Sequence, residues 1–170
     1  MSAWDSITGV IKEIKTCEKA GATTSAVAMA FVCIDTMAYL SLPAGRETQR
    51  KADFISWVDM HLKGHVDQAY QYRGLDVYGA RCAVLHAFGS ESDFHDEYKD
   101  AKKFGYHGGG EHAYDPKVDE RLVIIGTASF LNDVVIAVTS FLDSCKADTH
   151  LRTRVESRLP KVLATFPVYA

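Results

Sequence analysis

The sequence has little of what marks disulfide-rich or repetitive proteins. Its 170 residues contain only four cysteines, and no two of them form a C-x-x-C pair. A disulfide framework is typical of a shorter chain with a higher density of cysteine. Internal repeats and low-complexity tracts are also missing. We therefore expect a globular protein whose cysteines are free.

The chain also lacks a surplus of charge of one sign. It has 19 Lys and Arg against 22 Asp and Glu, so its formal net charge is −3. This balance excludes a strongly basic protein that binds nucleic acids through its overall charge, so any nucleic-acid site must be local. The first 15 residues carry acids and lysines at helical spacing, unlike a secretory signal. The prediction is a protein of the reducing cytoplasm.

What the sequence does have is apolar residues at helical spacing. Hydrophobic residues make up 47% of the chain, enough to bury a core of one domain. Segment 23–43 is long enough to span a membrane, but it contains Asp35 and has no flanking basic cluster, so we interpret it as a buried central helix rather than a membrane span. The apolar spacing and the positions of Gly and Pro predict helices at 4–20, 23–42, 48–63, 75–88, 126–145 and 149–166.

Residues 89–121 interrupt this pattern. They are rich in charge and include three consecutive glycines at 108–110. We expect an irregular surface insertion there, with a short β-hairpin that pairs residues 104–107 with residues 122–125. The predicted fold is all-α, a single domain over residues 1–170 built as a compact up-and-down bundle of five or six helices with this insertion.

The most informative stretch is the predicted helix at 75–88. Arg81 falls within its apolar stripe, and His86 lies on a second face of small residues that includes Gly79 and Ala83. A face of small residues lets another helix approach closely. A permanent charge in an apolar stripe needs a partner. Both polar side chains are therefore expected to have a specific role.

The segment from Arg81 to His86 resembles the Arg-x4-6-His motif of the HEPN superfamily (higher eukaryotes and prokaryotes nucleotide-binding domains). Members of this superfamily are compact helical bundles, and many are metal-independent RNases of toxin and phage-defence systems. The order of the predicted helices is similar, with two long helices before the motif helix and one or two after it. The resemblance covers most of the chain in architecture and six residues in motif.

The resemblance implies an RNase site made of Arg81 and His86, without a metal or a cofactor. Histidine suits proton transfer because its pKa lies near neutrality, and arginine offers a planar fork for phosphate oxygens. Five residues separate the two side chains by about 140° around a helix, so a homodimer that brings both pairs into one cleft is expected. RNA or a nucleotide is the expected ligand, and an antitoxin protein is a further partner that the resemblance implies.

Two positions depart from the superfamily pattern. Cys82 follows the arginine, where active members usually carry Asn, Asp or His, and it is expected to support the site only as a weak hydrogen-bonding group. Phe88 stands where some members carry a tyrosine that a partner nucleotidyltransferase modifies. The second departure excludes that modification at this residue.

A structural role for the same residues is an open alternative. Arg81 could join two helices by pairing with Asp35 or Asp76, and His86 could bind a backbone carbonyl, in a non-catalytic helical dimerisation or binding module. Asp35 is the only charge between Lys19 and Arg46. In either case we expect Asp35 to face a polar cluster between helices or the cleft of Arg81.

Histidines elsewhere suggest a third alternative, a metal-binding helical protein. His107, Glu111 and His112 have suitable donor types, although the glycines between them favour a solvated loop. His61 and His65 are interpreted as the exposed end of a helix.

The last predicted helix carries Arg152, Arg154 and Arg158. These arginines are expected either to contact RNA phosphates beside Arg81 and His86, or to form a solvated outer face.

Overall fold

The computed structural model describes residues 4–162, and this part of the chain is mostly helical. Its long apolar segments form helices at the predicted places, and the insertion contains a short helix and two strands. The elements are α1 (Asp5–Lys19), α2 (Thr23–Leu40), α3 (Lys51–His61), α4 (Gly74–Ala87), α5 (Asp93–Glu97), β1 (Lys103–His107), β2 (Leu122–Gly126), α6 (Thr127–Ala147), α7 (Thr149–Arg158) and a short 3₁₀ helix (Leu159–Lys161).

The core is built around α2. This helix contacts α1, α3, α4 and α6, and half of its residues are buried, including Phe31 and Ile34. Both α2 and α6 are long and apolar enough to cross a membrane by length and composition alone, a test that core helices also pass. The contacts of α2 on several sides explain why its sequence is apolar nearly all round. The prediction of a central helix in this segment is confirmed.

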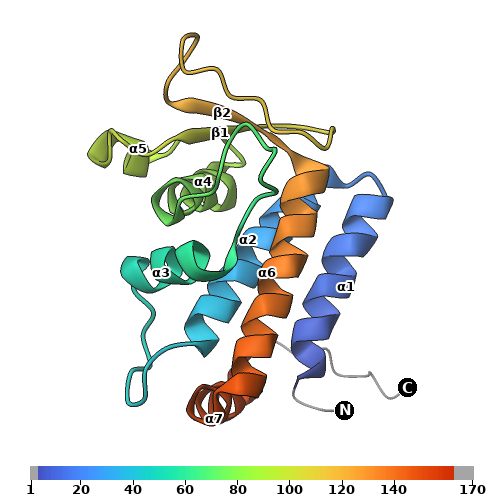
Figure 1. Ribbon diagram of the computed structural model, residues 1–170, viewed down its shortest axis with the longest axis vertical. Coiled ribbons are helices and arrows are strands. Elements are labelled where there is room, and N and C mark those ends of the chain that lie inside the picture. The colour runs from blue at the N-terminus through green and yellow to red at the C-terminus, as the bar shows by residue number, and fades with distance from the viewer. Residues whose placement is uncertain (1–3, 163–170) are drawn as a thin grey trace.

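The helices do not all run up and down. Figure 1 shows α1, α2 and α6 side by side along the long axis, whereas α3 and α7 run across them. The helix at the C-terminal side is shorter than predicted, because α7 gives way at Leu159 to a 3₁₀ turn that contains Pro160. The rest of that predicted helix, from residue 163, lies outside the described residues.

The two strands of the insertion pair at the predicted place but in the opposite direction. β1 and β2 are parallel, with Lys103 opposite Leu122, so the predicted hairpin is wrong. After β1 the chain turns back along the far side of β2, where Ala113 and Ile124 exchange two backbone hydrogen bonds of 2.8 and 2.9 Å. β2 therefore lies between β1 and this returning segment, an arrangement that the long connection between the strands allows.

Gly126 makes room for the returning segment. A Cβ atom at this position would lie 2.7 Å from the carbonyl oxygen of Gly110, which is too close for any other residue type. The same junction leads directly from β2 into α6. The sheet thus covers the upper ends of the long helices, beside α4 and α5 (Figure 1).

Candidate functional site

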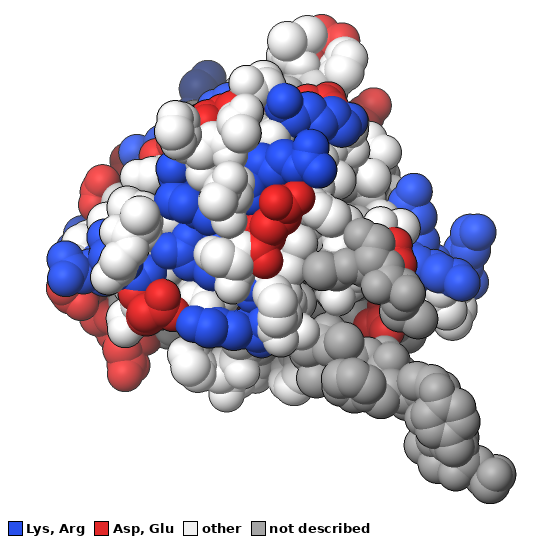
Figure 2. Space-filling view, turned by 90° about the horizontal axis from the view of Figure 1, so that it is seen from below, with Lys and Arg blue, Asp and Glu red and all other residues white. Residues whose placement is uncertain are grey.

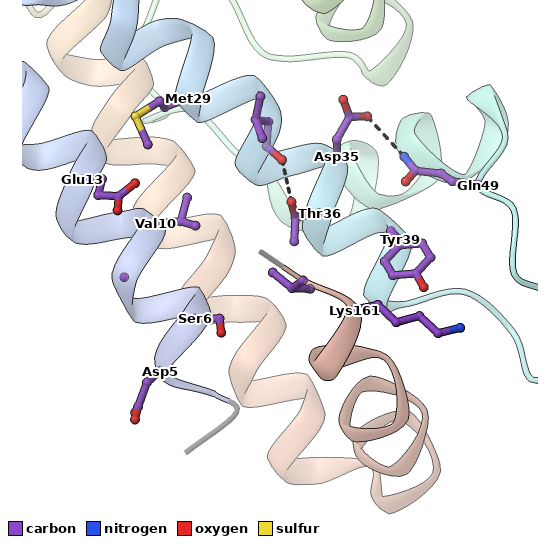
Figure 3. Close-up of a pocket in the computed structure, with 13 residues that line it drawn as sticks. Asp5, Ser6, Val10, Glu13, Met29, Asp35, Thr36, Tyr39, Gln49 and Lys161 are labelled. Carbon is purple, nitrogen blue, oxygen red and sulfur yellow. Dashed lines mark hydrogen bonds between the residues drawn. The ribbon is translucent and has the colours of Figure 1, made fainter. Parts of the chain in front are cut away.

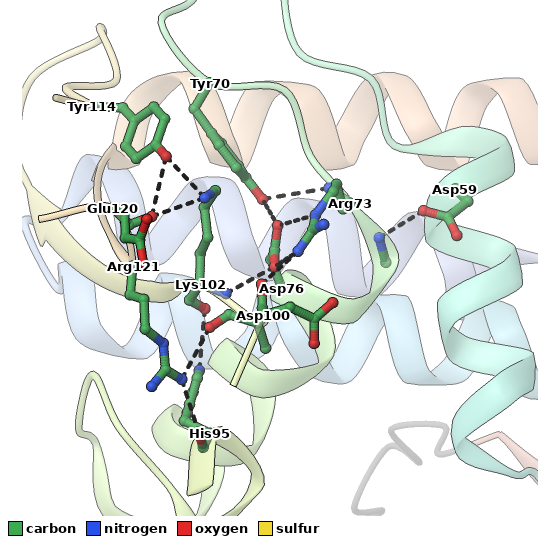
Figure 4. Close-up of polar contacts among 12 residues, drawn as sticks. Asp59, Tyr70, Arg73, Asp76, His95, Asp100, Lys102, Tyr114, Glu120 and Arg121 are labelled. Carbon is green, nitrogen blue, oxygen red and sulfur yellow. Dashed lines mark hydrogen bonds and ion pairs between the residues drawn. The ribbon is translucent and has the colours of Figure 1, made fainter. Parts of the chain in front are cut away.

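The start of α4, the helix that carries Arg81 and His86, is fixed by a fully buried carboxylate. Asp76 accepts hydrogen bonds from the hydroxyl of Tyr70 at 2.8 Å, from Arg73 at 2.7 and 2.8 Å, and from the backbone N–H of Lys102 at 2.8 Å. Figure 4 shows these groups converging on Asp76. Because four donors satisfy this carboxylate, Asp76 is not the partner of Arg81.

Arg81 pairs instead with Asp35 of α2. Its Nε atom lies 2.8 Å from Oδ2 of Asp35, and the two side chains are 25% and 24% exposed. Partial burial alone lowers the pKa of Arg81, but the hydrogen bond and charge of Asp35 outweigh it and raise the pKa above its ordinary value. The prediction that Asp35 faces Arg81 is confirmed.

The pair uses only part of the arginine. Nε of Arg81 donates the hydrogen bond to Asp35, and the thiol of Cys82 is a weaker hydrogen-bonding neighbour of the same guanidinium. The second oxygen of Asp35 accepts a weaker hydrogen bond of 3.3 Å from Gln49. Arg81 is therefore held in one orientation while its two terminal amino groups have no carboxylate partner.

Asp35 also borders a groove between α1 and α2, drawn in Figure 3. The groove has a volume of about 590 Å³, and Arg81 does not line it. Its charged lining residues are Asp5, Glu13 and Asp35 against Lys161. This excess of carboxylates makes the groove a poor site for phosphate.

His86 faces a different cavity. It is exposed near the last turn of α4 and borders a space of about 450 Å³ together with Cys82, Glu91 and Asp93. Arg81 does not line this cavity either. In one chain, the two motif residues thus lie on different sides of α4, as their spacing predicts.

The small-residue face of α4 is covered from within the same chain. A Cβ atom on Gly79 would lie 2.8 Å from the His95 side chain and 3.0 Å from that of Phe94, both of which belong to α5. Ala83 on the same face is buried. The expectation that another helix approaches this face closely is therefore confirmed, and that helix is α5 of the same chain, which the sequence analysis missed.

The histidines of the glycine-rich loop are engaged in hydrogen bonds. His107 contacts the carbonyl of Glu111 at 2.7 Å and accepts the N–H of Gly109 at 3.0 Å. His112 accepts the N–H of Gly126 at 3.1 Å on one nitrogen and contacts Tyr72 with the other. Within residues 4–162 no three His, Cys, Asp or Glu side chains are grouped to hold a metal ion. Both loop histidines thus contact groups of the protein itself, and the alternative of a metal site in this loop stays a prediction.

His112 belongs to a buried chain of polar groups that no pattern in the sequence indicates. Since its Nδ1 accepts a hydrogen bond, its Nε2 donates to the Tyr72 hydroxyl at 2.6 Å, and Tyr72 donates to Asp133 at 3.1 Å. Burial lowers the pKa of His112 and raises the pKa of Asp133. The three residues come from distant parts of the chain, so only the folded structure brings them together.

The arginines of the last helix do not act together. Arg158 is only 4% exposed and donates to the carbonyls of Leu42 and Pro43 at 2.8 Å and of Arg46 at 3.1 Å, just beyond the end of α2. The prediction that Arg158 contacts RNA directly is therefore wrong, because its side chain is buried. Arg152 is exposed and pairs with Glu156 at 2.9 Å.

The position of α7 also differs from the expectation. Figure 2 shows the face that carries α7, where Lys and Arg side chains gather with a few acidic ones among them. This face lies at the end of the long helices away from the sheet, and α3 separates it from α4 (Figure 1). The basic residues of α7 do not lie beside Arg81 and His86.

His61 differs from its interpretation as an exposed residue. It is buried against the rings of Trp57 and Phe141, with Nδ1 3.1 Å from the Ser140 hydroxyl. Burial and the charge of Lys63 lower the pKa of His61. The imidazole is therefore a core group rather than a surface cation.

Comparisons of the chain with protein-family models, curated proteins and solved structures found no match. The chemistry of the site thus rests on its own residues. His86 is an accessible imidazole that makes no hydrogen bond with a described residue, and Arg81 is a partly accessible guanidinium whose orientation is fixed. Together they have the groups for proton transfer and for phosphate binding, on two sides of one helix.

Proposed function

We propose that the chain is a HEPN-like, metal-independent protein that cleaves RNA, of the toxin or phage-defence type, with an active site composed from two copies. The observation that carries this proposal is the state of His86 on α4. Its imidazole is exposed, borders a cavity and is free of hydrogen bonds to residues 4–162. A free imidazole on the motif helix is what a general acid or base requires.

The proposed reaction is cleavage of RNA by its own 2′-hydroxyl. One His86 takes the proton from that hydroxyl, and the His86 of the second copy gives a proton to the leaving oxygen. The terminal amino groups of Arg81, which Asp35 leaves unpaired, stabilise the charge on the phosphorus centre. Two copies are needed because one chain supplies a single imidazole at this helix.

The surface by which the two copies meet is proposed to be the exposed end of α4. Phe88, which follows this helix, is 70% exposed and has a positive φ of 49°, a conformation that is costly for an aromatic residue. It lies two residues from His86, so a contact there places the two imidazoles near a two-fold axis. A cytoplasmic location and control by an antitoxin protein belong to the same proposal.

A second candidate function is a non-catalytic helical module. The ion pair between Arg81 and Asp35 favours it, because the pair also serves to join α4 to α2. Cys82 favours it as well, since a thiol is a weak hydrogen-bonding group. In this case His86 has no chemical task.

Replacing His86 distinguishes the two candidates. His86→Ala is expected to leave the stability and the dimer intact, because the side chain is exposed, and to lower RNA cleavage by about 10²–10⁴-fold. Arg81→Lys is expected to impair cleavage too, because an ammonium lacks the planar fork. The measurement is cleavage of a labelled RNA in EDTA, with the dimer checked by light scattering.

His150→Ala is the matched control, since His150 is also exposed but lies on α7. It is expected to cleave RNA like the unaltered chain. A purified dimer that does not cut RNA, or equal activity of the His86 and His150 variants, favours the non-catalytic module.

A further inference from the structure

Another cavity, separate from the groove beside Asp35 and from the cavity beside His86, lies between α3, α6, α7 and the segment that follows α2. Its volume is about 450 Å³, and neither Arg81 nor His86 lines it. Part of its wall is apolar and consists of Leu42, Phe141 and Leu151, with the exposed Met60 beside them. A cavity of this size and lining is typical of sites for small organic molecules.

The polar part of the wall consists largely of donors that lack acceptors. Trp57 is 3% exposed, and its indole N–H is buried without a hydrogen-bond partner. The Nε groups of Arg46 and Arg154 are in the same state. These are three of the six buried side-chain atoms without a partner among residues 4–162, and all three belong to residues that line this cavity. Unpaired buried donors are unfavourable, so an acceptor that enters here is stabilised.

The charged side chains around the cavity are two arginines, Arg46 and Arg154, and two aspartates, Asp53 and Asp148. Arg46 is neutralised by its ion pair with Asp53. Arg154 forms no side-chain hydrogen bond or ion pair with any residue from 4 to 162, so its guanidinium is free to bind a ligand. The nearby Asp148 carboxylate accepts the backbone N–H groups of His150 and Leu151 at the start of α7. Asp148 and Arg154 attract each other through space without a hydrogen bond. The guanidinium of Arg154 is therefore a charged donor group of this wall that has no hydrogen-bond acceptor among residues 4–162.

We propose that this cavity is a binding site for a small organic anion, a carboxylate or a phosphate monoester attached to a flat apolar group. The anionic oxygens bind the guanidinium of Arg154, and the indole N–H of Trp57 is the donor for a further acceptor. The flat group packs against Leu151 and the exposed Met60. The site is independent of the proposed RNase function, because it shares no residue with the motif helix.

Trp57 is also the reporter for the test. The chain contains two tryptophans, so Trp4→Phe leaves Trp57 as the only one. Its fluorescence is titrated with phenyl phosphate, benzoate and AMP, with benzamide and adenosine as uncharged counterparts, and with inorganic phosphate as an anion without an apolar group. At least one of the three apolar anions is expected to give a saturable change with at least tenfold tighter binding than its uncharged counterpart, and inorganic phosphate is expected to bind more weakly.

Two neighbouring arginines provide the matched variants. Arg154→Gln is expected to weaken binding of the anion at least tenfold, whereas Arg152→Gln is expected to leave it unchanged, because Arg152 does not line the cavity. Met60→Ala is a third variant on the surface, expected to weaken binding of the apolar anions without affecting folding. Far-UV circular dichroism confirms that each variant is folded.

Several outcomes overturn the proposal. One is a lack of saturable change with every apolar anion, and another is equal affinity for the charged and uncharged probes. A third is that the Arg152→Gln and Arg154→Gln variants bind the apolar anion with equal affinity. A short RNA oligonucleotide is titrated in parallel, and binding that is weakened equally by both substitutions shows a nucleic-acid surface rather than a site for a small anion. None of these results depends on RNA cleavage, so the proposed function is judged separately.

Discussion

Two arginines of this protein, the buried Arg158 and the partly exposed Arg81, differ in role because their acceptors differ. Arg158 binds backbone carbonyls beyond the end of α2, which is a structural task that leaves its Nε without a partner. Arg81 binds a carboxylate through Nε alone and keeps its terminal amino groups available. Residue type and local sequence do not separate the two cases, since both arginines lie on helices near apolar residues. The difference lies in what the fold places opposite each one.

The ion pair of Arg81 gives a first prediction at this scale. Asp35→Ala is expected to destabilise the fold by about 1–3 kcal/mol, because it leaves a partly buried guanidinium without its acceptor. Urea unfolding measures the change. The double variant Asp35→Ala with Arg81→Met is expected to cost less than the sum of the two single changes. An unchanged unfolding midpoint in Asp35→Ala shows that the pair contributes nothing.

The buried histidines give a second prediction. Burial lowers the pKa of His61, His95 and His112 below the ordinary value of 6.5. The unfolded chain therefore takes up protons near pH 6.5 that the folded chain does not bind. The stability that these residues contribute is present above pH 6.5 and is lost as the pH falls toward their pKa values in the folded chain, by up to about 1.4 kcal/mol per pH unit for each histidine.

The contribution of one histidine is isolated by comparing slopes. His61→Gln is expected to reduce the fall in unfolding free energy between pH 7 and pH 5, whatever its effect at neutral pH. Urea titrations at several pH values measure this slope for the variant and the unaltered chain. Identical slopes contradict a neutral, buried His61.

At the scale of elements, the sequence predicts the helices, because their positions depend on the local spacing of apolar residues. The long helices follow from apolar spacing, and glycine and proline mark several of their ends. The missed element, α5, is only five residues long, too short to show a periodicity. The direction of β2 was also missed, because it depends on how residues 108–121 fold back, and a pattern of apolar residues looks the same in a parallel and an antiparallel strand.

Two glycines give opposite predictions for the same substitution. A Cβ atom on Gly74, the first residue of α4, would lie 2.5 Å from the backbone oxygen of Ile55 in α3, so Gly74→Ala is expected to destabilise the fold by about 1–3 kcal/mol. Gly9 lies inside α1 with open space around its Cβ position, so Gly9→Ala is expected to stabilise it by about 0.5–1 kcal/mol. Thermal unfolding measures both. Destabilisation of similar size in both variants contradicts a specific close approach of α3 and α4.

At the scale of the whole molecule, the candidate site was predictable only in part. Asp35 was one of two carboxylates, with Asp76, that were expected as the partner of Arg81, because a charge within an apolar helix needs a partner. The chain of Tyr72, His112 and Asp133 and the cavity beside Trp57 and Arg154 join residues that are far apart in sequence. No spacing rule connects such residues. They depend on how α3, α6, α7 and the insertion pack together.

The hydrogen bonds from Arg158 to the carbonyls beyond α2 have a consequence for folding during synthesis, because their two sides are made at different times. Ribosomes make the chain from its N-terminus, and Leu42 is made 116 residues before Arg158, the residue that binds its carbonyl. At about 5–20 residues per second this interval lasts roughly 6–23 seconds. Until it ends, only water or a chaperone can satisfy the carbonyls beyond α2. The central helix of the core is thus synthesised early, but the carbonyls beyond its C-terminal end lack their arginine donor until synthesis has passed residue 158.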